Sequence, residues 1–237
     1  MDKLIPYDRL KIITPFLMVI TYLSAFKDNK PTCDRYILNY FLYLVTSIVL
    51  FLTMGDLTEE YLFTDGRYSL ILSLLGSIGI IIALHYTNNV WIRHLLWIGL
   101  ITCLAIGSKE LYQRYDKKEI TNVIKKILVI IVICAFIALK FPEYIKPGYI
   151  RQLVISLIIV VILGLVDFFI FKQKYHKLIS TLIVFVFTMF IIYDTHRVLI
   201  DSKECGKTKN GAEYLDNVIN MFLNLINLFN NLLILEN

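Results

Sequence analysis

The 237-residue sequence lacks the short motifs that mark most catalytic and nucleotide-binding sites. It contains no Gly-x-Ser-x-Gly element, no phosphate-binding P-loop, no Gly-x-Gly-x-x-Gly fingerprint and no His-Glu-x-x-His zinc motif. Its four cysteines, at positions 33, 103, 134 and 205, form no Cys-x-x-Cys pair and no metal-binding spacing. We therefore predict a protein that is not an enzyme, has no resident cofactor, and keeps its cysteines as structural thiols without a disulfide framework.

Charge is also scarce. Only 18% of the residues are charged, and the net charge of +5 comes from Lys and Arg that lie between the apolar stretches. Membrane proteins commonly hold basic residues in their loops, so this charge gives little support to a nucleic-acid partner. We predict that the protein does not bind nucleic acid and that its main partner is the lipid bilayer.

Long apolar runs are abundant instead. Hydrophobic residues make up 57% of the chain and the mean hydropathy is +0.67. Most runs approach the roughly 20 residues that a helix needs to cross about 30 Å of hydrocarbon, and they lack the alternation of barrel strands. The sequence predicts an all-α polytopic bundle of about seven transmembrane spans with an additional amino-terminal hydrophobic helix. The runs cover residues 10–26, 36–54, 68–84, 95–107, 127–139, 152–166, 168–171 and 177–193, followed by an amphipathic segment at 212–235.

The first run, residues 10–26, is interrupted by Pro15 and admits two interpretations. It has features of a signal peptide, but we favour a membrane-associated or partly inserted helix. The predicted organisation is an amino-terminal segment, residues 1–35, followed by the bundle, residues 36–237. If this run does not cross the membrane, the side of the amino terminus carries 14 basic residues and the other side 10. If it crosses, the side of the amino terminus carries 13 and the other side 11. Either count favours a cytosolic amino terminus by a small margin.

Three acids stand out because an ionised carboxylate is costly inside a membrane and usually faces the bundle interior with a partner. Asp167 lies late in its run, Asp194 closes the following run, and Asp216 lies in the first turns of the last helix. We predict that they line an ion path. The alternative, an interfacial position where water solvates the carboxylate, stays open, above all for Asp167. His196, two residues after Asp194, is a candidate modulator of that acid's pKa.

The last segment carries a polar stripe made of Asn217, Asn220, Asn224, Asn227 and Asn231. At 100° per residue these amides fall within an arc of about 100°, together with two acids near the start of the helix. A helix lying on a membrane surface normally carries Lys or Arg on its polar face, and residues 212–235 contain none. Neutral amides suit interhelical hydrogen bonds or a narrow hydrated path, so we predict that the stripe faces into the bundle. Biased base composition would explain the abundance of asparagine, but not its confinement to one face.

Two segments near the carboxyl end carry a family resemblance. Tyr193-Asp194-Thr195 ends the penultimate run, and residues 222–233 read Phe-Leu-Asn-Leu-Ile-Asn-Leu-Phe-Asn-Asn-Leu-Leu. They resemble the Bax-inhibitor family, also called the transmembrane Bax inhibitor motif or Lifeguard family. Its members carry a Tyr-Asp-Thr-like element and a final helix of the form Tyr-Leu-Asp-x-Ile-Asn-Leu-Phe-x-x-Leu-Leu. The agreement in motifs covers about 45 residues, and the length and number of apolar runs also agree.

The resemblance implies a calcium-permeable leak protein of internal membranes, in the endoplasmic reticulum or Golgi, that suppresses cell death. The gate proposed for the family is a pair of aspartates sharing one proton. Two close carboxylates cannot both ionise cheaply, so one pKa rises and the pair titrates as a unit. The deprotonated pair offers hard oxygen ligands that suit Ca²⁺. The resemblance places Asp194 in this role, as a transient contact for Ca²⁺ as the permeant ion.

The sequence departs from the family pattern at the second aspartate, where the longer match places Asn224. An alternative register uses Asp216 as the second acid but shifts the following Asn-x-Phe by one residue, which rotates it by about 100°. We prefer the longer match. It predicts one hydrogen bond between Asp194 and Asn224, no shared-proton switch, and calcium passage that is less pH-gated, weaker or lost. The rival hypothesis is a non-conducting protein that modulates apoptosis by binding membrane-protein partners through its helices.

Overall fold

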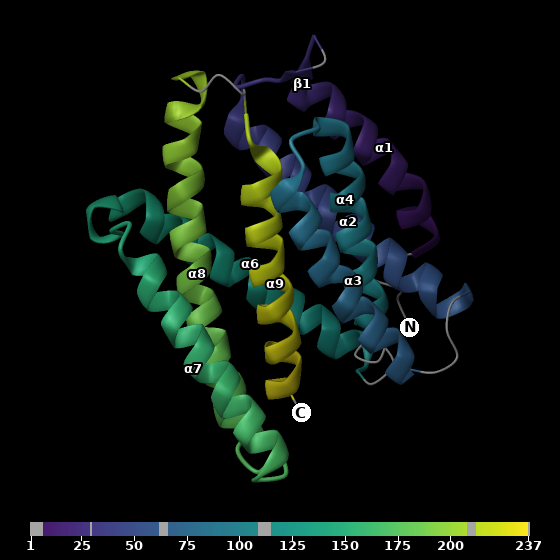
Figure 1. The fold of residues 1–237 in the computed structure, drawn as a ribbon, viewed down its shortest axis with the longest axis vertical. Helices are drawn as coiled ribbons and strands as arrows, with labels where there is room; N and C mark the ends of the chain where they lie inside the picture. Colours follow the sequence, from purple (N-terminus) through teal and green to yellow (C-terminus); the bar gives the residue numbers. More distant parts are fainter. Residues whose placement is uncertain (1–6, 29, 62–65, 109–114, 208–211, 237) are drawn as a thin grey trace. The chain divides into compact units, whose positions relative to one another are not determined.

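The computed structural model describes residues 7–28, 30–61, 66–108, 115–207 and 212–236 (Figure 1). The secondary structure of these residues is almost entirely helical, which confirms the predicted all-α class. The long helices are α1 (Tyr7–Ala25), α2 (Tyr36–Tyr61), α3 (Gly66–Tyr86), α4 (Val90–Gly107), α6 (Lys117–Lys140), α7 (Tyr149–Phe169), α8 (His176–Glu204) and α9 (Tyr214–Glu236). Short elements connect them: the strands β1 (Phe26–Lys27) and β2 (Lys30–Pro31), which pair antiparallel, and the 3₁₀ turns η1 (Pro142–Tyr144) and η2 (Cys205–Lys207).

Six of the described helices are long and apolar enough to cross a membrane, namely α2, α4, α6, α7, α8 and α9. The apolar stretch Ile71–Tyr86 of α3 is shorter than these six. Helices are the expected solution because hydrocarbon offers no water to the backbone, and a helix satisfies its own N–H and C=O groups. The outer surfaces of α6 and α7 carry many exposed apolar side chains, as contact with lipid requires. The polytopic membrane architecture is therefore confirmed.

Side chains at the first turn explain where two of the spans begin. The Asn89 carboxamide oxygen accepts hydrogen bonds from the backbone N–H groups of Trp91 and Ile92, at 3.0 and 3.3 Å, and starts α4. The N–H of Asp116 donates to the Glu119 carboxylate at 2.9 Å, as part of a capping box that starts α6. Such caps satisfy N–H groups that have no partner within their own helix.

The amino-terminal run forms α1, which packs along α2. Two pairs of buried hydroxyls join the helices: Thr14 with Thr53 and Thr21 with Thr46, each at 2.7 Å. Residue numbers rise on one helix as they fall on the other, so the two helices run antiparallel. Both threonines of α2 lie within its candidate span, Tyr36–Gly55. Helix α1 therefore lies at the depth of α2 over most of its length, which is deeper than a helix resting on the membrane surface.

The chain folds into two compact units. The first comprises residues 1–114 and 204–219, and the second comprises residues 115–203 and 220–237. In the first unit, α3 packs against α4, and α2 packs against both α1 and α4. In the second unit, α7 and α8 form an antiparallel hairpin closed by a tight turn (Figure 1). Helix α9 contributes its first turns to the first unit and the rest to the second.

A disulfide joins Cys33 to Cys205 within the first unit, so the prediction of unpaired cysteines was wrong for these two. Cys103 and Cys134 remain free thiols, the second of them buried. The paired residues are 172 positions apart, and both lie in polar connections outside the apolar runs. The spacing of cysteines in a sequence does not indicate which distant loops meet at one end of a helical bundle. This pairing could therefore be identified only from the folded structure.

We expect the disulfide to be visible by thiol counting on the denatured chain. A maleimide-polyethylene-glycol reagent should tag two cysteines, Cys103 and Cys134, without reductant, and four after reduction. The variant Cys33→Ser should give three tags without reductant, because it releases Cys205. Four tags on the unreduced wild-type chain would contradict the disulfide.

Candidate functional site

Asp194 is the acid at the centre of the candidate site. It projects from α8 and is only 7% exposed, in a helix whose preceding residues, Ile191 and Ile192, are also buried. Asn224 of α9 donates a hydrogen bond from its amide nitrogen to the Asp194 carboxylate at 2.6 Å. Both residues belong to the second unit. The contact is the one that the longer register predicts.

The Asp194 carboxylate retains capacity for further ligands. An ionised carboxylate has two oxygens and about four acceptor positions. Asn224 donates the one hydrogen bond found for it in the described part of the chain, where no Lys or Arg forms an ion pair with it. Arg197, one turn further along α8, is near enough to act on this carboxylate electrostatically, but its ion pair is with Asp201. Asp194 therefore has no direct countercharge among the described residues, and the position favours a cation over a neutral solute.

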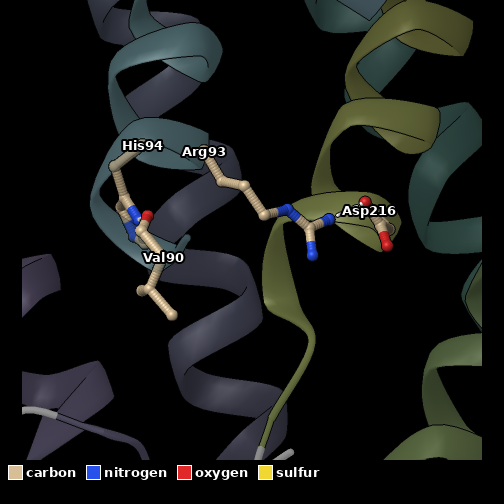
Figure 2. Close-up of polar contacts among 4 residues, drawn as sticks. All are labelled: Val90, Arg93, His94 and Asp216. Carbon is tan, nitrogen blue, oxygen red and sulfur yellow. Dashed lines mark hydrogen bonds and ion pairs between the residues drawn. The ribbon is translucent and has the colours of Figure 1, made fainter. Parts of the chain in front are cut away.

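Asp216 lies in a different electrostatic setting. Arg93 extends from α4 and donates from its terminal nitrogen to the Asp216 carboxylate on the first turn of α9 (Figure 2). Both residues belong to the first unit. The carboxylate is also well placed at a helix amino terminus, where negative charge is favourable. Its charge is therefore balanced, unlike that of Asp194.

Asp167 stabilises the turn between α7 and α8 through hydrogen bonds. Its carboxylate accepts a hydrogen bond from the Tyr175 backbone N–H at 2.9 Å, and its own carbonyl accepts from the N–H of Gln173 at 3.0 Å. Lys172 and Gln173 have φ values of 51° and 65°, a left-handed conformation that the Asp167 contacts hold in place. The observed contacts of Asp167 are thus those of a turn-forming residue.

The polar stripe of α9 does not act as one surface. Asn217 and Asn224 are buried and bond to other helices, Asn217 through the Tyr36 hydroxyl at 3.0 Å. Asn227 and Asn231 donate to carbonyls of their own helix at 2.8 Å, and Asn220 is exposed. Only part of the stripe therefore makes the interhelical contacts that were predicted for it. His196 is half-buried, and the structure describes no hydrogen bond between it and Asp194.

Sequence reasoning missed a polar network in the first unit. The Tyr214 hydroxyl donates to the Thr32 carbonyl and accepts from the Asn39 amide, the latter at 3.1 Å. The Tyr43 hydroxyl and the His94 imidazole are hydrogen-bonded at 2.7 Å. Asn39 lies inside the apolar run 36–54, and that position was a signal available from the sequence. In the described residues, no cluster of three or more His, Cys, Asp or Glu side chains is placed to hold a metal ion.

The family assignment follows from a comparison with known families. A family described as inhibitor of apoptosis-promoting Bax1 matches residues 12–236, nearly the whole chain. The protein therefore belongs to the Bax-inhibitor family and is an integral membrane protein. The matched range includes most of α1, which the prediction had set apart as a separate segment. No curated protein matches the sequence.

The interhelical hydrogen bond should contribute to stability. Asn224→Ala leaves the buried Asp194 carboxylate without its donor, so we expect a loss of about 0.6–2 kcal/mol in the free energy of unfolding. Asn227→Ala is the matched control, because that amide bonds to its own helix. Unfolding in detergent micelles, followed by circular dichroism, measures both. Equal losses for the two variants would argue against a stabilising contact between α8 and α9.

Proposed function

We propose that this protein is an ion-leak protein of an intracellular membrane, passing cations, above all Ca²⁺, along a path that includes Asp194 and polar groups of α9. It is proposed to act without enzymatic chemistry or a resident cofactor and to suppress cell death by lowering the calcium content of the store. Family membership supports this proposal, and the single observation that carries it is the environment of Asp194.

The buried position of Asp194 costs folding free energy, which a role in ion passage would explain. A buried acid in a membrane-spanning helix costs a few kcal/mol on insertion scales, and it is normally offset by a cationic partner. Here the hydrogen-bond partner is the neutral amide of Asn224, and the nearby Arg197 forms its ion pair with Asp201 instead. A packed apolar side chain at the same position would stabilise the bundle more. A passing Ca²⁺, which prefers carboxylate and carbonyl oxygens, would supply the missing positive charge.

The proposed leak depends on pH less than that of relatives with two aspartates. A shared proton requires two carboxylates within contact distance, and Asn224 contributes an amide that does not titrate. Asp216 does not replace the second acid, since it pairs with Arg93 and lies eight residues earlier on α9, about 12 Å along the helix axis. Protonation of Asp194 alone then sets the pH response, with a single-site titration.

The proposed location is the endoplasmic reticulum or the Golgi. The Cys33–Cys205 disulfide supports a membrane that borders an oxidising lumen. We propose that α1 crosses the membrane beside α2, to which it packs antiparallel, so that it begins on the opposite side from this disulfide. That arrangement gives the amino-terminal side 13 basic residues and the disulfide side 11. Both the charge bias and the disulfide then favour a cytosolic amino terminus.

A second candidate function is a non-conducting protein that modulates apoptosis by binding membrane partners. Asn220 favours it, because this amide is exposed on a membrane-spanning helix. An amide facing hydrocarbon gains from a hydrogen bond to a neighbouring helix, which a partner protein would provide. Loss of the Asp194 charge would leave this activity unchanged, so the variant Asp194→Asn distinguishes the two functions.

Asp194→Asn should reduce calcium flux through the purified protein in liposomes by about tenfold or more, because the carboxylate is the ion's proposed ligand. The substitution keeps the shape of the side chain and its ability to contact Asn224. Glu204→Gln is the control, since it removes an exposed carboxylate at the end of the same helix. Flux in Asp194→Asn equal to the wild-type flux would defeat the ion-leak proposal.

Asn224→Asp should introduce a steeper pH response near neutrality. It would set two carboxylates in contact, and such a pair holds one shared proton until the pH rises through its raised pKa. Flux should therefore increase with pH more sharply in the variant than in the wild type. Asn227→Asp, one helical turn further along α9, serves as the control. A variant profile as shallow as that of the wild type would show that Asn224 does not occupy the position of the second aspartate.

A further inference from the structure

The first unit contains a cavity of about 490 Å³ that the ion path does not use. It lies where the end of α1 and its short hairpin meet the first residues of α4 and α9. Its walls combine aromatic rings with ionic and polar groups. Those that matter below are Phe26, Tyr43, Arg93, His94, Glu213 and Tyr214.

The first residues of two candidate spans line the cavity, which corresponds to the depth of lipid headgroups. Helices α4 and α9 are candidate spans, and the cavity is lined by their first residues, Val90 and Tyr214. Trp91, which is 56% exposed, lies next to the cavity, with its ring stacked against Phe26 at 6.3 Å between centroids. Tryptophan and tyrosine side chains collect where hydrocarbon meets the headgroup layer. A ligand of this cavity is therefore within reach of the membrane surface.

Arg93 lines the cavity and gives it a guanidinium group whose N–H groups are only partly used by Asp216. One terminal nitrogen donates to Asp216 (Figure 2), and the buried Nε–H has no hydrogen-bond partner among the residues that the structure describes. A guanidinium group binds carboxylates and phosphates through several N–H groups of its planar fork. The first residues of α9 also line the cavity, and a helix amino terminus favours anions. This side of the cavity suits a phosphate oxygen.

The remaining walls suit a positive group. Glu213 is exposed at the edge of the cavity, and the rings of Phe26, Tyr43 and Tyr214 form its aromatic side. Aromatic faces together with a carboxylate bind ammonium groups, including quaternary ones. Both ring nitrogens of His94 already have hydrogen-bond partners. Nδ1 lies 2.7 Å from the Val90 carbonyl, and because a carbonyl only accepts, Nδ1 is the donor. In the neutral ring Nε2 then accepts a hydrogen bond from the Tyr43 hydroxyl.

We propose that this cavity binds the zwitterionic headgroup of a phospholipid, with its phosphate on Arg93 and its ammonium group between Glu213 and the aromatic rings. A headgroup of this kind matches both the separated charges and a cavity of about 490 Å³, within the usual range for small-ligand sites. A soluble phosphodiester such as glycerophosphocholine offers the same chemistry without acyl chains. The proposal is independent of the ion leak, because it uses residues of the first unit alone.

Native mass spectrometry of the full chain in maltoside detergent tests the proposal by titration with phosphatidylcholine. The wild-type protein should saturate with one retained lipid, and Arg93→Gln should weaken its binding about tenfold or more. Arg197→Gln is the matched control, since that residue is also a basic partner of an acid on a span but lies in the second unit. Glu213→Gln should weaken phosphatidylcholine binding while leaving phosphatidylglycerol, which has no ammonium group, unaffected.

Two further results would overturn it. Unchanged phosphatidylcholine binding in both Arg93→Gln and Glu213→Gln would remove the cavity as the site. Full competition by glycerophosphocholine at the concentration of the lipid would remove the lipid as its occupant. If Arg93→Gln lowers the melting temperature so far that the protein does not fold, Glu213→Gln decides, because that side chain is exposed and makes no described contact on which the fold depends.

Discussion

The structure depends on one constraint: a polar side chain that joins two helices inside the membrane needs a partner on the neighbouring helix. The contacts that join distant helices in the described residues follow it. Hydroxyls face hydroxyls between α1 and α2, an amide meets a tyrosine hydroxyl at Asn39, and an amide meets a carboxylate at Asp194. Apolar side chains pack equally well against lipid or protein, so they leave helix register and orientation open. The few polar pairs decide both.

The same constraint distinguishes Asp216 from Asp194. Asp216 has a full countercharge in Arg93, and its position at the start of the helix leaves it partly in contact with solvent. Asp194 is buried and has only an amide. The two carboxylates thus have unlike chemistry: one closes a structural ion pair, and the other keeps a charge available. The family motif is retained at Asp194 and altered at its partner, Asn224.

How much of this could be read from the sequence depends on how local each feature is. The helices were predictable because their apolar runs are continuous and long enough to cross a bilayer. The Asp194–Asn224 contact was predictable because both residues fall on recognisable motifs of consecutive spans. The Arg93–Asp216 pair and the Cys33–Cys205 bond were not, since each joins positions more than 100 residues apart, near helix ends in the first case and in polar connections in the second. No periodicity links such positions, and only the packing of the spans brings them together. The inward stripe was predicted from helix geometry, but two of its amides satisfy themselves on their own helix.

The Cys33–Cys205 bond also has a topological consequence. It closes a covalent ring that contains α2 to α8, while α1 and α9 lie outside the ring as tails. The ring keeps its ends together even when a loop within it is cut, so a nicked chain would migrate as one piece until it is reduced. The tail formed by α9 has no such restraint and is held by non-covalent contacts alone, beginning with Tyr214 beside the bond. Asn224, on this tail, therefore meets Asp194, inside the ring, through a non-covalent contact that the disulfide does not restrain.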